Sequence, residues 1–165
     1  MNARAKAWIG SGIFLLLAPG IVAGVVPYLL TGWRGADWGR AGLAISVIAA
    51  VLILSGVVFL LQAFVRFAAD GLGTPAPVAP TEHLVMTGVY RWVRNPMYLA
   101  VWSIILGQGL LFASVPLLVY LLAAATAMVL FVKLYEEPTL ERKYGDEYRE
   151  YRQQVPGWLP RRPRN

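Results

Sequence analysis

The longest uncharged stretch of the chain, residues 97–132, constrains the fold more than any other feature. Its thirty-six residues contain no acidic, basic or histidine side chain. As one helix it would extend about 54 Å, whereas the hydrocarbon core of a bilayer is about 30 Å thick. Residues 113–116, Ala-Ser-Val-Pro, provide a break near its middle. We therefore predict a tight hairpin of two membrane helices, residues 97–113 and 116–132.

Two further segments are long and uncharged, residues 8–30 and 41–65. Each reaches the ~20 residues that a helical membrane span needs. Pro19 and Pro27 predict a kink in the first span, and Arg66 is expected to end the second. The first segment is long for the hydrophobic region of a signal peptide, so we expect it to remain as a span.

Composition agrees with these segments. The chain has 165 residues, 58% of them hydrophobic and 15% charged, and its mean hydropathy is +0.56. An average soluble domain has about 25% charged residues. The fold class that we predict is an all-α integral membrane protein of one domain, residues 1–165, with four transmembrane helices.

The positive charge lies in a few places. Thirteen of the fifteen Lys and Arg residues fall in residues 1–7, 66–94 and 133–165. The positive-inside rule assigns these segments to the cytoplasmic side, so both termini are expected there. We expect the plasma (inner) membrane of a prokaryote, with membrane lipids as partners of the basic residues and no nucleic acid.

Several kinds of site are disfavoured by residue content. The chain has no cysteine and one histidine, so neither disulfides nor a metal site is expected. The four predicted spans contain no ionisable side chain except tyrosine, which disfavours a proton channel or pump.

A polar stretch, residues 83–98, directly precedes the hairpin. It contains one histidine, two arginines and two tyrosines, and it includes Asn95 and Pro96. Proline suits the first turn of a helix, and a helix beginning at Pro96 directs its free N–H groups back toward this stretch. We predict a pocket in this stretch. A Gly- and Pro-rich linker, residues 70–80, connects the second span to it.

The C-terminal part changes from apolar to charged at Lys133. Apolar and aromatic residues then recur at spacings of four, four, three and four, which predicts a cytoplasmic amphipathic helix. These residues are Leu140, Tyr144, Tyr148, Tyr151 and Val155. The helix either lies on the membrane surface or closes over the polar stretch. The second arrangement would bring Glu136, Glu137 and Tyr148 toward the arginines Arg91 and Arg94.

Two motifs carry a family resemblance. The first is His83-Leu-Val-x-x-Gly-Val-Tyr-x-x-x-Arg94-Asn95-Pro96-x-Tyr98, and the second is Glu136-Glu137-x-x-Leu-x-x-x-Tyr-Gly-x-x-Tyr-x-x-Tyr-x-x-x-Val-Pro. Together they resemble the isoprenylcysteine carboxyl methyltransferase family, which is related to the membrane phospholipid N-methyltransferases. The resemblance covers residues 80–160.

The resemblance implies an integral membrane enzyme that uses S-adenosylmethionine, releases S-adenosylhomocysteine and takes a lipophilic substrate or lipid from the bilayer. Its cofactor pocket would be formed by residues 83–99 and 133–156. Carried over by position, the cofactor-binding residues are His83, Val85, Gly88, Tyr90, Asn95, Pro96, Tyr98, Leu99, Glu136, Glu137 and Tyr148. The usual motif is Arg-His-Pro, and Asn95 in place of histidine argues against a general base at this position.

Arg94 and Glu137 are the candidate catalytic residues. A carboxylate acceptor arrives ionised and needs a cation to place it, for which Arg94 is the candidate. An amine acceptor must lose a proton, which Glu136 or Glu137 would accept. The structural alternatives are that Arg94 binds a lipid phosphate and that the two glutamates stabilise a helix start.

The function that we favour from sequence is carboxyl O-methylation of an isoprenylcysteine-type substrate. The alternatives within methyltransferases are phospholipid or amine N-methylation and thiol S-methylation. From another class, the alternative is a non-catalytic membrane protein whose basic face binds anionic lipid. Binding of S-adenosylmethionine would distinguish the enzymes from this scaffold.

Overall fold

The computed structural model describes residues 3–36, 38–39, 42–70 and 83–162, and its regular structure over these residues is helical. Residues 71–80 of the predicted linker lie outside the described residues. In chain order, the elements are α1 (Ala3–Gly20), the π-helical η1 (Ile21–Val25), α2 (Val26–Thr31), α3 (Gly42–Asp70), the 3-10 helix η3 (Gly88–Arg91), α4 (Pro96–Leu111), α5 (Val115–Phe131), the π-helical η4 (Val132–Glu136), α6 (Glu137–Tyr144) and α7 (Asp146–Gln154).

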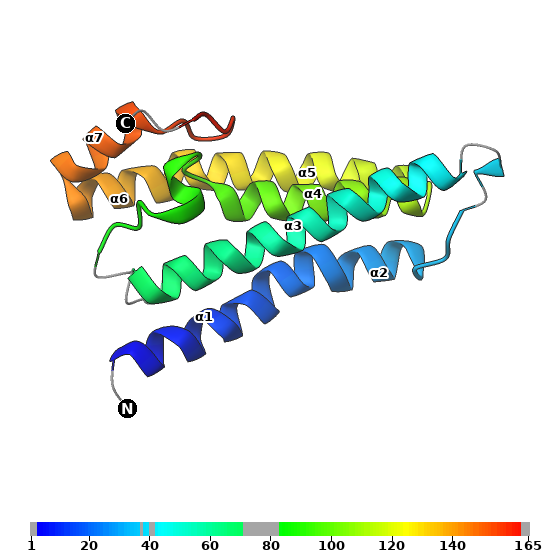
Figure 1. The fold of residues 1–165 in the computed structure, drawn as a ribbon, viewed down its shortest axis with the longest axis horizontal. Coiled ribbons are helices and arrows are strands. Elements are labelled where there is room, and N and C mark those ends of the chain that lie inside the picture. Colours follow the sequence, from blue (N-terminus) through cyan, green and yellow to red (C-terminus); the bar gives the residue numbers. More distant parts are fainter. Residues whose placement is uncertain (1–2, 37, 40–41, 71–82, 163–165) are drawn as a thin grey trace.

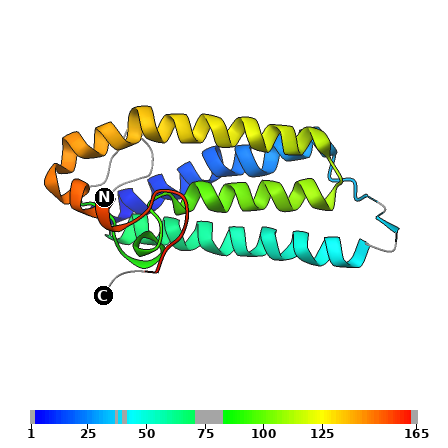
Figure 2. The ribbon, with the colours of Figure 1, turned by 90° about the horizontal axis from the view of Figure 1, so that it is seen from above.

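The apolar helices lie side by side in an elongated bundle (Figures 1 and 2). Within the described residues, three helical stretches are long and apolar enough to cross a membrane: Trp8–Thr31, Gly42–Asp70 and Val115–Tyr144. The fourth apolar helix is Pro96–Leu111, whose sixteen residues make it shorter than the other three. The prediction of an all-α membrane fold is confirmed.

The helix boundaries follow local chemistry at both ends of α4. Pro96 is its first residue, as the Asn-Pro pair predicts. Ser114 caps the start of α5, where its side chain accepts a hydrogen bond from the Leu117 N–H. The second span extends beyond its predicted end, because α3 continues past Arg66 to Asp70.

Two glycines allow α3 and α4 to pack closely along their length. A Cβ on Gly56 would lie 2.8 Å from the Ala100 carbonyl oxygen, and one on Gly107 would lie 2.8 Å from that of Ala49. Both distances are too short for any larger residue. The contact is reciprocal, since each helix contributes one glycine, and small residues at such crossings are typical of membrane helices.

Each π-helical segment lies just before a proline. The residue before Pro27 and the residue before Pro138 both donate their backbone N–H to the carbonyl five residues earlier. The wider π turn accommodates a proline ring that an α-helical turn would exclude. The first helix is therefore continuous but irregular at η1, and toward its N-terminus α1 diverges from α3 (Figure 1).

The C-terminal part differs from the single amphipathic helix that was predicted. The helix of α5 does not end at residue 132 but continues through η4 into α6. The chain then turns at Gly145, whose φ of 56° ends α6, and α7 follows in a new direction. Tyr148 and Tyr151 are buried, and the hydroxyl of Tyr151 donates to the Tyr90 carbonyl oxygen at 2.8 Å. One residue at positive φ changes the direction of the chain, whereas the spacing of the aromatic residues along the sequence stays that of a single helix.

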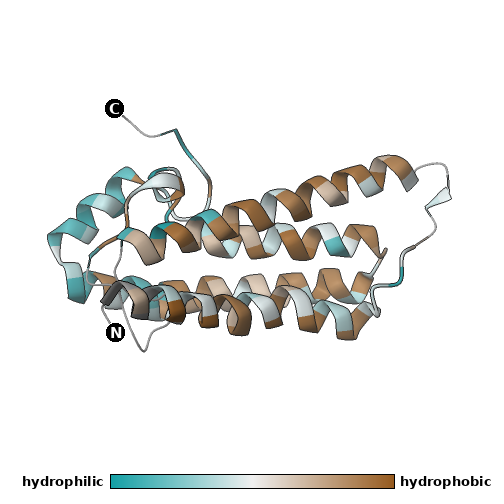
Figure 3. Ribbon diagram, turned by 60° about the horizontal axis from the view of Figure 1, so that its bottom comes forward, coloured by the Kyte–Doolittle hydropathy of each residue, from teal (hydrophilic) through white to brown (hydrophobic). Residues whose placement is uncertain are grey.

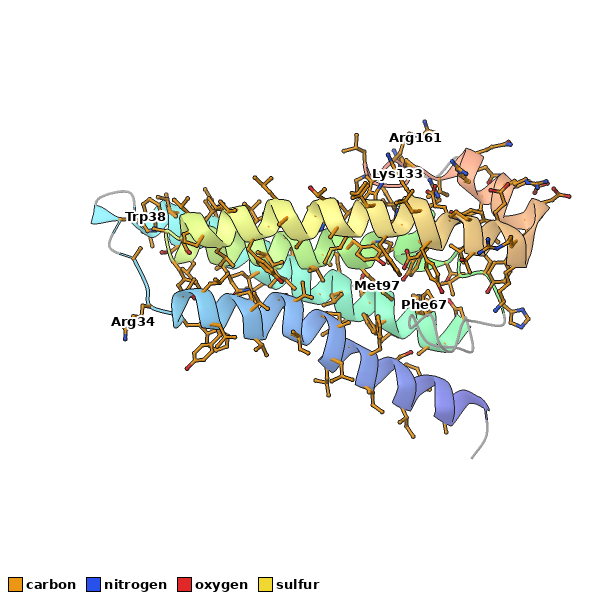
Figure 4. The ribbon with its side chains drawn as sticks, turned by 180° about the vertical axis from the view of Figure 1, so that it is seen from behind. Arg34, Trp38, Phe67, Met97, Lys133 and Arg161 are labelled. Atoms are coloured by element: carbon orange, nitrogen blue, oxygen red, sulfur yellow. The ribbon has the colours of Figure 1, made fainter. Side chains whose placement is uncertain are left out.

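The polar residues gather at one end of the bundle. Helices α6 and α7, η3 and both described ends of the chain lie at this end, where the hydrophilic colouring is concentrated (Figures 1 and 3). Arg34 and Trp38 lie at the opposite end (Figure 4).

Candidate active site

A cavity of about 290 Å³ opens at the polar end of the bundle. One part of its wall is apolar and comes from the membrane helices, including Phe14, Ala18 and Val22 of the first helix, Phe64 and Phe67 of α3, and Met128 of α5. Phe67 and Met97 (Figure 4) both line the cavity, and both pack against the buried cluster of Ala63, Val85 and Tyr90. The volume is close to the lower end of the about 300–1,000 Å³ typical of small-molecule sites.

The polar part of the wall is centred on Arg94. Its Nη1 atom donates to Oε1 of Glu137 at 2.8 Å and to the hydroxyl of Tyr148 at 2.9 Å. Its Nε atom donates to the Val155 carbonyl oxygen at 3.0 Å. The Arg94 and Glu137 side chains are only 12% and 14% exposed, so this ion pair is largely desolvated. A second arginine, Arg152, lies 3.6 Å from the other oxygen of Glu137.

Glu136 is bound differently from its neighbour. Its Oε1 atom accepts a hydrogen bond of 2.6 Å from the hydroxyl of Tyr98. Of the two glutamates, Glu137 forms ion pairs with arginines. Glu136 has the Tyr98 hydroxyl as its partner and no paired cation within the described residues. Consecutive helical residues point in different directions, which is why the two carboxylates have separate partners. The cavity therefore contains one neutralised carboxylate and one available carboxylate.

Tyr90 contributes a buried hydroxyl that has no partner in the structure. The residue lines the cavity and is 6% exposed. Its hydroxyl oxygen is fully buried, and no described side chain or backbone group forms a hydrogen bond with it. An unpaired buried hydroxyl costs about 1–3 kcal/mol, so this one calls for a partner such as a bound ligand or a water molecule.

The buried tyrosines near the cavity keep their protons. Burial, with added repulsion from Tyr151 and Glu136, raises the pKa of Tyr90 well above its ordinary value. Burial likewise raises the pKa of Tyr151. Burial raises the pKa of Tyr148, although the Arg94 guanidinium acts in the opposite direction. These hydroxyls are neutral hydrogen-bond donors at neutral pH rather than bases.

The structure brings most of the candidate residues together around this cavity. Those that line it are Val85, Tyr90, Arg94, Asn95, Pro96, Tyr98, Glu136, Glu137 and Tyr148. Three others do not line it. His83 is exposed, whereas Gly88 and Leu99 line a separate groove on the side of α3 and α4. The backbone of Gly88 has a φ of 58° and lies against the Arg66 side chain, which is a structural reason for glycine at this position.

The sequence did not predict every residue of the cavity wall. Residues of the first helix and of α3 line it, yet their sequence has only the apolar character of any membrane span. The contact of the segment after α7 with the start of α4 was not predicted either. The amide of Asn95 donates to the Gly157 carbonyl oxygen at 3.0 Å, so this segment supports the start of α4 from outside the cavity.

The family comparison agrees with this site. Residues 44–147 match the family model described as phospholipid methyltransferase, a match that covers more than half of the chain and extends from α3 into α7. No curated protein matches the chain significantly. The residues that match include both halves of the polar wall, Arg94 to Tyr98 and the glutamate pair. The chain therefore belongs to the phospholipid methyltransferase family, and it is a membrane methyltransferase.

Proposed function

We propose that this protein transfers a methyl group from S-adenosylmethionine to a lipophilic acceptor in the cavity beneath α6 and α7. The observation that carries this proposal is the composition of the cavity wall, which joins a polar cluster to apolar side chains of four membrane helices. A charged cofactor and a lipophilic substrate require such a combination at one place.

The residues at the polar wall fit the functional groups of this cofactor. Its ribose hydroxyls can donate hydrogen bonds to a carboxylate such as Glu136, and its sulfonium is suited to the faces of aromatic rings. Tyr98 and Tyr148 provide rings, and the unpartnered hydroxyl of Tyr90 provides a buried donor. The expected binding set thus includes Val85, Tyr90, Asn95, Pro96, Tyr98, Glu136, Glu137 and Tyr148.

Bound S-adenosylmethionine supplies an electrophilic methyl group on a sulfonium, and S-adenosylhomocysteine is the other product. The side chains of the cavity orient the reactants and exclude water. Orientation alone is worth up to about 7–11 kcal/mol when two reactants are held in line. No side chain has to form a covalent bond with the substrate in this mechanism.

The arrangement of charge favours an amine over a carboxylate as methyl acceptor. Arg94 already binds Glu137, Tyr148 and a backbone carbonyl, so it has limited capacity for a substrate carboxylate. Glu136 has no paired cation among the described residues, so an ammonium group is the substrate group that complements it. Glu136 is then positioned to accept the proton that the amine must lose before methylation.

Carboxyl O-methylation, which the sequence resemblance favours, is the second candidate. Arg94 lines the cavity. For this reaction Arg94 would exchange its bond to Glu137 for one to the substrate carboxylate, at the cost of leaving Glu137 with only the more distant Arg152.

The proposed site lies at the end of the bundle where Arg161 and Lys133 lie (Figure 4). We propose that this end is cytoplasmic, in accordance with the positive-inside rule, and that the acceptor enters from the bilayer.

The direct test is calorimetric binding of S-adenosylmethionine and S-adenosylhomocysteine to the detergent-purified protein. We expect micromolar binding that Glu136→Gln weakens at least about tenfold, since a charge-assisted hydrogen bond is worth about 1.5–3 kcal/mol. Glu141→Gln is the matched control, because Glu141 pairs with exposed Arg149 rather than lining the cavity. A folded sample that binds neither compound would favour the lipid-binding scaffold.

Acceptor class is then tested with methyl-labelled cofactor and a panel of acceptors that share one alkyl chain and differ only in an amine, carboxylate or thiol headgroup. We expect label in the amine product. Transfer to the carboxylate alone would instead support the exchange at Arg94.

A further inference from the structure

The segment after α7 returns across the start of α4. The Arg94 N–H donates to the Pro156 carbonyl oxygen at 2.9 Å, and the Arg161 N–H donates to that of Trp92 at 3.0 Å. Between them, Asn95 donates its side-chain amide to Gly157. This segment, residues 155–161, lies beyond residue 147, where the family match ends. It does not line the cavity, but it supports two cavity residues, Arg94 and Asn95, from outside.

The orientation of the Arg94 guanidinium depends on this segment. A guanidinium is planar, so two hydrogen bonds from different nitrogens fix both its position and its plane. One of these bonds goes from Nη1 to Glu137, and the other goes from Nε to the Val155 carbonyl oxygen. Without the second bond, the group would rotate about its contacts with Glu137 and Tyr148.

Gly157 provides space for the third nitrogen of the same guanidinium. A Cβ on Gly157 would lie 3.2 Å from Nη2 of Arg94 and 3.6 Å from Nδ2 of Asn95. The first distance is shorter than ordinary van der Waals contact. Because the other two nitrogens are bound, Arg94 cannot yield to an added methyl group without displacing its bond to Glu137 or to Val155.

Trp158 supports Tyr98, which forms the second hydrogen-bonded pair of the cavity wall with Glu136. Its ring stacks on that of Trp102 with centroids 5.0 Å apart and planes at 6°, and it lies 6.2 Å from the ring of Tyr98. Trp102 is also held by its Nε1–H, which donates to the Met128 sulfur at 3.1 Å. The Tyr98 ring, which donates to Glu136, therefore rests against a fixed aromatic pair.

We propose that residues 155–161 position the cofactor site, with Gly157 acting through Arg94 and Trp158 acting through Tyr98. Both are positioning residues, since neither lines the cavity. The proposal rests on the proposed function, because its readout is the affinity for S-adenosylmethionine.

The first comparison is Gly157→Ala against Gly35→Ala in the full-length protein, with S-adenosylmethionine affinity measured by calorimetry. A Cβ on Gly35 meets nothing within 4 Å, and its neighbour Arg34 lies at the opposite end of the bundle (Figure 4), so Gly35 is a matched control. We expect Gly157→Ala to weaken binding by the folded protein about three- to tenfold, because the added methyl group displaces the Arg94 guanidinium from its hydrogen bonds and one hydrogen bond is worth about that factor. Gly35→Ala should bind like the unchanged protein.

The second comparison is Trp158→Ala and Trp158→Phe against Leu159→Ala, whose side chain is 81% exposed. Trp158→Ala should weaken binding about tenfold, and Trp158→Phe should restore most of the affinity because it keeps a ring against Trp102 and Tyr98. A role in folding alone would instead lower the unfolding temperature of Trp158→Ala and leave the affinity of the folded fraction unchanged.

A double-mutant cycle tests the route through Arg94. Arg94→Lys removes Nη2, so Gly157→Ala should weaken binding no further in this background. An equal loss in both backgrounds would overturn the route through Arg94. Affinities of Gly157→Ala and Trp158→Ala equal to that of the unchanged protein would overturn the whole inference. Failure of the unchanged protein to bind would instead be a failure of the proposed function, so the two outcomes are separate.

Discussion

The hydroxyl of Tyr98 donates a hydrogen bond of 2.6 Å to Oε1 of Glu136. The two residues are thirty-eight positions apart, and the bond joins the first turn of α4 to the π-helical end of the membrane stretch that begins with α5. It leaves Glu136 as a carboxylate that faces the cavity without a paired cation in the described structure. This pair is therefore the first target for mutation.

Tyr98→Phe removes the hydroxyl and keeps the ring that rests against Trp158. We expect S-adenosylmethionine affinity to fall about tenfold, because the carboxylate loses the bond that orients it and bonds to charged groups contribute about 1.5–3 kcal/mol. Tyr28→Phe is the control, since Tyr28 is 51% exposed and does not line the cavity. Equal affinities in a calorimetric titration would remove the Tyr98–Glu136 pair from the cofactor site.

Arg94→Ala should destabilise the protein strongly. It leaves the desolvated Glu137 carboxylate without its 2.8 Å partner, and breaking a buried pair on one side costs about 3–5 kcal/mol. Arg149→Ala is the matched control, because Arg149 also has two carboxylate partners but its side chain is 59% exposed. Unfolding in detergent, followed by circular dichroism, should show a large loss of stability for Arg94→Ala and little change in stability for Arg149→Ala. Similar losses for both would argue against a buried pair.

Gln108→Leu should destabilise the bundle by about 1–3 kcal/mol, the cost of an unsatisfied buried polar group. Pro27 has no N–H, so the Ala23 carbonyl has no donor four residues later in its own helix. The buried Gln108 amide donates to this carbonyl oxygen at 2.7 Å instead. Gln62→Leu, at an exposed position of α3, should have little effect in the same unfolding experiment. An unchanged midpoint for Gln108→Leu would show that the carbonyl tolerates the loss.

Tyr90→Phe should separate stability from function. The hydroxyl is buried without a hydrogen-bond partner among the described residues, so its removal should leave stability unchanged or higher. If the hydroxyl binds cofactor or substrate, the same change should weaken S-adenosylmethionine binding or acceptor methylation about tenfold.

Tyr151→Phe is the control for Tyr90→Phe. It should lower the stability of the protein, because it deletes a hydrogen bond to the Tyr90 carbonyl oxygen. Thermal midpoints and calorimetric affinities measured on the same samples check both expectations. A Tyr90→Phe protein that is less stable and binds normally would show that the hydroxyl has only a structural role.

Local sequence was sufficient for much of the helical framework. The start of α4 at Pro96 and the break before α5 at Ser114 follow from backbone chemistry, which depends on neighbouring residues alone. Continuation of α5 past residue 132 was not predicted, because the predicted span ends where the uncharged run ends, before Lys133, whereas the helix continues through a π turn that precedes Pro138. The bend at Gly145 was not predicted either, since the spacing of the aromatic residues is the same in one helix or in two.

By itself, the sequence determined that this is an all-α membrane protein with a polar motif at the mouth of an apolar hairpin, because burial of uncharged segments in a bilayer depends on length and composition. Only the tertiary structure decided which side chains meet: Arg94 with Glu137, Tyr98 with Glu136, and the first helix with the cavity. Such pairings depend on the rotation and register of packed helices. Close contacts such as that of Gly56 with Ala100 set the rotation and register of the helices. No local pattern contains the effect of such contacts on side chains that are thirty-eight or more positions apart in the sequence.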